Sequence, residues 1–205
     1  MSLLKSAWEI ALEKTKDIEG DPQKIREEEL FNKGRRLAGT YLNELEDNGS
    51  KIPKQLKKAT EEQRKLMADG IRATILANIA LPQNSLFAER VEKLQHLAEI
   101  VDGPQSEAVP LIAKIGQVLA KYVEARDSLL ERARAQYQPI FEEKREQLRQ
   151  QYGSGANISM EQDPEFVQFL QRNFNQLSGQ YQQVLEQAKE QLKGIWSPTS
   201  NGPSA

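Results

Sequence analysis

His96 is the single histidine of this 205-residue sequence, and its surroundings come nearest to those of a catalytic or metal-binding group. Glu92 lies one helical turn before it in "VEKLQHLAEI", and Glu89 and Glu99 lie near the same side of a helix. Carboxylates around an imidazole can hold a metal or relay a proton. A di-iron bundle, however, needs a Glu-x-x-His motif on each of two helices, which one histidine cannot supply. The ordinary alternative is a surface helix on which His96 lies near Lys93 and Glu92.

Other kinds of catalytic chemistry find no support in the residue types. The sequence has no cysteine, which excludes thiolate catalysis and cysteine-bound metal. It contains no Gly-x-Ser-x-Gly motif, and "NKGRRLAG" lacks both glycine patterns that bind phosphates between a strand and a helix. We therefore expect a non-enzymatic protein that has no catalytic residues, no cofactor and no metal.

Two basic clusters in the first half could bind anions. If they converge on one face, they could neutralise several phosphates of nucleic acid or anionic lipid. Acidic residues are interleaved with them, no aromatic residue lies in the lysine run to stack bases, and the net charge is −2. A solvated helix face is the ordinary alternative. The anion-binding candidates are Lys33, Arg35, Arg36, Lys51, Lys54, Lys57 and Lys58.

Aromatic residues are concentrated near the end of the chain, on a stretch with a regular heptad pattern. If a partner helix covers only one side of this stretch, Phe166 and Phe169 need a further partner within the domain or in a second chain. We therefore predict a surface for self-association or for another helical protein. Its residues are Phe166, Phe169, Leu170, Phe174, Tyr181 and Trp196.

The elements that would position these residues are all helical. In the first half, apolar spacing and capping residues predict helices over 3–20, 22–46, 61–80 and 86–101. Asp21 precedes a proline, and Thr60 and Gln63 fit a capping box. Trp8 is expected to anchor the first helix to those that follow. "DNGSKIP" (47–53) is expected to break the chain.

The second half predicts two long helices that form an antiparallel hairpin. Apolar residues recur at steps of three and four over 107–152 and again over 164–196, with a connector at about 152–164. Arg126 and Lys144 lie within the first apolar stripe. Pro139 should kink or divide the first helix.

The predicted fold is all-α, with a bundle of four to five shorter helices followed by a long, coiled-coil-like antiparallel hairpin and no sheet. We expect an N-terminal helical bundle over 1–102, a hairpin over 103–196 and a disordered tail over 197–205. No stretch is long and apolar enough to span a membrane, and a cytoplasmic location is expected. The predicted function is that of a helical interaction or scaffold protein, and the alternative is an anion-binding helical module that binds nucleic acid or anionic lipid.

Overall fold

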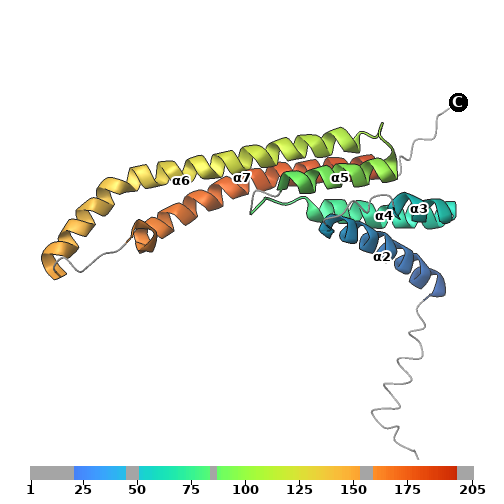
Figure 1. The fold of residues 1–205 in the computed structure, drawn as a ribbon, viewed down its shortest axis with the longest axis horizontal. Coiled ribbons are helices and arrows are strands. Elements are labelled where there is room, and N and C mark those ends of the chain that lie inside the picture. Colours follow the sequence, from blue (N-terminus) through green and yellow to red (C-terminus); the bar gives the residue numbers. More distant parts are fainter. Residues whose placement is uncertain (1–20, 45–50, 84–86, 153–158, 198–205) are drawn as a thin grey trace, which may run out of the picture. The chain divides into compact units, whose positions relative to one another are not determined.

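The computed structural model describes residues 21–44, 51–83, 87–152 and 159–197 (Figure 1). In these ranges the chain forms six α-helices and one 3-10 helix, without a strand, which confirms the all-α prediction. The helix expected over 3–20, with Trp8, and the tail from 198 onward lie outside the described residues. The chain divides into two compact units, Met1–Ile75 and Leu76–Ala205, which we call unit 1 and unit 2.

Unit 1 contains α2 (Pro22–Asn43), α3 (Lys51–Lys58) and most of α4 (Glu61–Asn78). The predicted capping residues begin two of these helices. The Asp21 carboxylate accepts a hydrogen bond from the amide of Gln23 at 3.0 Å. At the start of α4, the amide of Gln63 donates to the Thr60 hydroxyl at 3.4 Å, and the amide of Thr60 donates to the Gln63 side chain at 3.2 Å. This is the reciprocal capping box that the sequence predicts.

Helix α3 was not predicted, since the sequence pattern treats 47–53 as a break. The helix begins at Lys51 and places Pro53 in its first turn, where a proline costs no helical hydrogen bond. Ile52 and Leu56 are buried, and their spacing of four residues puts both on one face of the helix. Burial of this pair explains how a lysine-rich segment of eight residues forms a helix.

Two glycines let α2 and α4 approach until their backbones touch. A Cβ atom added to Gly34 would overlap the carbonyl oxygen of Met67 and lie 2.8 Å from its carbonyl carbon. A Cβ added to Gly70 would likewise overlap the carbonyl oxygen of Phe31. Each glycine therefore packs on the residue three positions before the other glycine, and neither position has room for a side chain.

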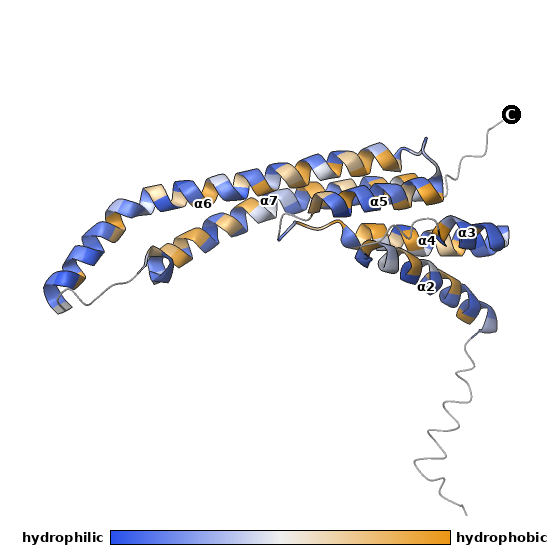
Figure 2. Ribbon diagram, viewed as in Figure 1, coloured by the Kyte–Doolittle hydropathy of each residue, from blue (hydrophilic) through white to orange (hydrophobic). Residues whose placement is uncertain are grey.

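Unit 2 contains α5 (Phe87–Asp102), α6 (Ala108–Tyr152), the 3-10 helix η1 (Met160–Gln162) and α7 (Pro164–Trp196). Helix α6 packs against α7 to form the predicted antiparallel hairpin, and α5 packs against α6. Hydrophobic residues are interspersed with hydrophilic ones along both long helices (Figure 2). The domain boundary predicted after residue 102 stays a prediction.

The difference in helix length gives unit 2 two distinct parts. At 1.5 Å per residue, α5 is about 24 Å long and α6 about 68 Å, so α5 can accompany only the first part of α6. We call the part that includes α5 the base, and we call residues 126–152 and 159–177 the arm. The base buries leucines and isoleucines from all three helices: Leu94, Leu97, Ile112, Ile115, Leu185 and Leu192.

Pro139 lies inside α6 without dividing it. Figure 1 shows that α6 is bent rather than straight. A proline in a helix has no amide hydrogen for the carbonyl four residues earlier, which explains a bend. None of the described helices is long and apolar enough to cross a lipid bilayer.

Candidate functional site

Three of the predicted anion-binding residues line an open hollow of about 330 Å³ between α2 and α3 in unit 1. Lys33 and Arg36 come from α2, and Lys51 comes from the first turn of α3. The rest of the lining is mixed: Leu37, Thr40, Tyr41, Ile52 and Gln55. We call this the first hollow.

A second hollow, of about 360 Å³, shares Lys33 and Gln55 with the first. Lys54 and Lys58 line it from α3. Its other lining residues are Leu30, Ala59, Gln63 and Met67. Five of the seven predicted cations therefore line two adjoining hollows, and neither lining includes an Asp or Glu among the described residues.

The two remaining candidates lie elsewhere on the same helices. Arg35 and Lys57 are exposed and line neither hollow. Along α2 the lining residues pass from the second hollow to the first, whereas along α3 they pass from the first to the second. Helix α3 thus runs antiparallel to α2, which brings cations from two helices together. Glu46 and Asp47, which are interleaved in the sequence, lie outside the described residues.

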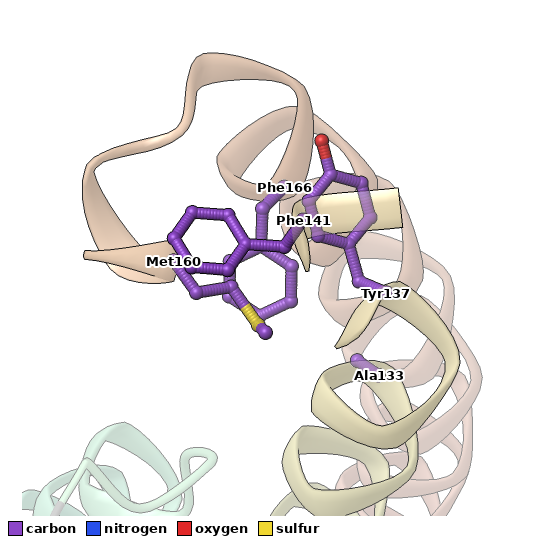
Figure 3. Packing of buried hydrophobic residues seen from close by; sticks show 5 residues of the cluster. All are labelled: Ala133, Tyr137, Phe141, Met160 and Phe166. Carbon is purple, nitrogen blue, oxygen red and sulfur yellow. The ribbon is translucent and has the colours of Figure 1, made fainter. Parts of the chain in front are cut away.

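Most side chains of the predicted interaction surface are partly or fully buried. Phe166 is 1% exposed and packs in a cluster near the end of the arm (Figure 3). The other members of this cluster are Ala133, Tyr137, Phe141 and Met160. Phe169 and Leu170 are partly buried against it. Of the two partners expected for Phe166, one within the domain and one in a second chain, the structure shows the first, because residues of α6 and η1 cover it.

The other residues of that predicted surface lie further along α7. The ring of Tyr181 meets the ring of Tyr122 edge-on, with centroids 5.3 Å apart. The indole of Trp196 donates to the Asp102 carboxylate at 2.7 Å, which joins the end of α7 to the end of α5. Phe174 is half-buried. The tyrosine contact joins the two helices of the hairpin, and the tryptophan hydrogen bond joins the hairpin to α5. Phe174, Tyr181 and Trp196 are thus each only partly exposed.

A buried carboxylate joins the two helices of the arm. Asp163 is 4% exposed and caps α7 by accepting from the amide of Glu165 at 3.0 Å. The Tyr137 hydroxyl donates to it at 2.9 Å, and the Lys144 ammonium lies 3.1 Å away. Lys144 also pairs with the Glu165 carboxylate at 2.8 Å. The network thereby fixes the register of α6 against the start of α7.

The charges of this network favour its ionised state. Burial raises the pKa of Asp163, but the hydrogen bonds from the Glu165 amide and from its two partners on α6 outweigh burial and lower the pKa below its usual value. The pKa of Lys144 is raised, chiefly by its bonds to Glu165 and Tyr137. The sequence carries a signal for this network, since Lys144 lies in a largely apolar stripe seven residues after Tyr137.

The group around His96 does not assemble into a metal site in the structure. Glu89 pairs with Lys93 at 2.9 Å, and Glu92 and Glu99 are exposed. Within the described ranges, no three His, Asp or Glu side chains lie where they could hold a metal ion. The described geometry therefore gives the carboxylate–imidazole hypothesis no further support.

Comparison with known proteins places most of the chain in a protein family. A family model described as a family of unknown function (DUF6657) matches residues 53–194, which is more than half of the chain. The matched stretch contains all of α4, α5, α6 and the arm. No curated protein and no protein of solved structure shows significant similarity to the chain.

Proposed function

Because the chain belongs to a family of unknown function (DUF6657), we propose its function from its geometry: it is a non-enzymatic helical interaction protein that self-associates through the arm. The observation that carries this proposal is that, among the described residues of unit 2, the arm is only two helices thick. The non-enzymatic part rests on the sequence, with its single histidine and its lack of cysteine.

A layer of two helices leaves much of its apolar stripe incompletely covered. Each helix of such a pair is buried on one side, whereas bundles of four helices bury a common core. In the arm, most apolar stripe residues are only half-buried: Leu129, Leu130, Leu148, Phe169, Leu170, Phe174 and Leu177. Ile140 and Val167 are each 48% exposed. This surface favours a further helical partner.

A second copy of the chain is the occupant that we propose. Two identical arms laid together would form a four-helix layer from the same surface on each copy, and such isologous contacts close a dimer. The charge of the arm permits this arrangement, because its seven Lys or Arg and eight Asp or Glu residues nearly balance and two copies would not meet as surfaces of one sign. Another helical protein with a similar stripe is the alternative occupant.

Sedimentation velocity of the full chain over a range of concentrations tests the proposal. Val167→Glu and Ile140→Glu place a charge on exposed positions of the arm and should weaken self-association at least about tenfold, because a buried, unpaired carboxylate is costly. Val184→Glu is the matched control: Val184 is 45% exposed and lies on α7 outside the arm. It should leave association unchanged. A wild-type chain that stays monomeric at high concentration would overturn the proposal.

A second candidate function is anion binding, which is favoured by the five cations that line the adjoining hollows of unit 1. Such binding should weaken by orders of magnitude between roughly 50 and 200 mM salt, because counterions are released when phosphates are neutralised. If neither nucleic acid, anionic vesicles nor small phosphate compounds bind at low salt, this candidate is wrong.

A further inference from the structure

We propose that the two adjoining hollows of unit 1 form one binding site for a small ligand that carries a chain of phosphate groups; this inference rests on the second candidate function. The ligand class is defined by the polyphosphate group, which is common to nucleoside triphosphates and to inorganic polyphosphate. Lys33 lines both hollows and is the central residue of the proposed site.

The arrangement of charge favours a chain of phosphates over a single one. Arg36 and Lys51 line one side of the site, and Lys54 and Lys58 line the other, with Lys33 common to both. A single phosphate would engage a few of these cations, whereas linked phosphates can extend past Lys33 and reach both sides. Arginine and lysine are the side chains that bind phosphate groups most strongly.

The size and shape of the site favour a small ligand over a nucleic acid or a lipid surface. Hollows of about 330 and 360 Å³ are in the range of pockets that take small molecules. A nucleic-acid strand or a membrane would contact the helices over a broad surface, on which Arg35 and Lys57 would serve as well as the lining residues. All seven cations are exposed, but only the other five line the hollows.

The first hollow is also lined by apolar and by uncharged polar side chains. The first hollow includes the apolar side chains of Leu37 and Ile52 and the ring of Tyr41, so it can accept an uncharged part of a ligand beside the phosphates. Thr40 and Gln55 supply a hydroxyl and an amide that can donate to phosphate oxygens. A nucleoside triphosphate would use both kinds of lining, whereas inorganic triphosphate would use only the polar kind.

Isothermal titration calorimetry of the full chain at low salt tests the site, with inorganic triphosphate and ATP as probes. We expect both to bind, with ATP tighter if the apolar lining of the first hollow takes the nucleoside. Lys33→Gln and Lys54→Gln should each weaken triphosphate binding about tenfold, since each removes a charged hydrogen-bond donor. Arg35→Gln and Lys57→Gln remove one positive charge each from the same two helices and should change the affinity less than about twofold.

Two further probes separate failure of this site from failure of anion binding as such. They are a single-stranded RNA oligonucleotide and vesicles that contain phosphatidylserine. If RNA or vesicles bind but triphosphate and ATP do not, or if all four variants weaken triphosphate binding equally, the small-ligand site is refuted while anion binding stands. If none of the four probes binds, both are refuted. Circular dichroism of each variant checks that the exposed substitutions leave the helices intact.

Discussion

Replacement of Gly34 by alanine should separate two helices that now touch. The added Cβ would lie 2.8 Å from the carbonyl carbon of Met67 and would overlap its carbonyl oxygen, whereas ordinary van der Waals contact begins at 3.4 Å. The obstacle is backbone, which cannot rotate away as the end of a flexible side chain can. Helices α2 and α4 must therefore move apart along the whole contact.

The separation of α2 and α4 sets the expected loss in the free energy of unfolding. Overpacking in a core costs about 1–3 kcal/mol, and here the value should lie at the upper end because both helices must shift. Alanine is otherwise a better helix former than glycine, and this preference offsets the overpacking cost by roughly 0.5–1 kcal/mol. We therefore expect Gly34→Ala to lower the free energy of unfolding of unit 1 by about 2 kcal/mol.

Gly39→Ala provides a matched control on the same helix. A Cβ at Gly39 meets nothing within 4 Å, so this substitution should stabilise the protein by roughly 0.5–1 kcal/mol. Native-state hydrogen exchange over 22–78, with urea unfolding of the full chain, measures both variants. If Gly34→Ala is as stable as the wild type, or more stable, the close crossing of α2 and α4 is refuted.

Three further predictions concern unit 2. Phe166→Ala should lower the free energy of unfolding by about 3–5 kcal/mol in urea denaturation because Phe166 is 1% exposed, whereas Val167→Ala, at a position 48% exposed, should change it by less than about 0.5 kcal/mol. Equal effects of the two would contradict the inward orientation of Phe166. The ionised Asp163 carboxylate stabilises the folded protein above the usual carboxyl pKa of 3.8, and this stabilisation is lost as the pH falls below it. Asp163→Asn should remove it. In an acid titration followed by circular dichroism, the stability of the variant should therefore depend less on pH between about pH 2 and 5 than that of the wild type. An unchanged acid profile would show that the carboxylate is not ionised in the network. Trp196→Phe removes the hydrogen bond to Asp102 and should cost about 1 kcal/mol, measured by urea denaturation, and a neutral effect would mean that this bond does not hold α7 to α5.

Local patterns predicted the helices well because the signals for helix ends are themselves local. Asp21 and Thr60 cap the helices that the sequence assigned to them, and the two long helices span the predicted ranges within a residue or two. A short helix such as α3 has too few residues to show a period, and its formation depends on the burial of Ile52 and Leu56.

Contacts between elements were harder to predict, since a heptad pattern says which residues share a face and not what that face meets. Phe166 was correctly placed on an apolar stripe, but its coverage by Met160 comes from a 3-10 helix inside a connector that looks featureless in the sequence. The basic residues also show that a sequence pattern does not reveal which side chains come together. Seven cations were equivalent in the sequence, and only the packing of α3 on α2 separates Arg35 and Lys57 from the five that line the hollows.

Site-specific photo-crosslinking of the purified full chain tests most directly whether the arm mediates self-association. A photoreactive residue placed at Ile140 or Val167 should produce covalent dimers whose yield rises with protein concentration, while the same residue at Val184 should not. Mass spectrometry of the dimers should locate both ends of the crosslink in the arm. No dimer from either arm position, or an equal yield from Val184, would contradict the proposed function.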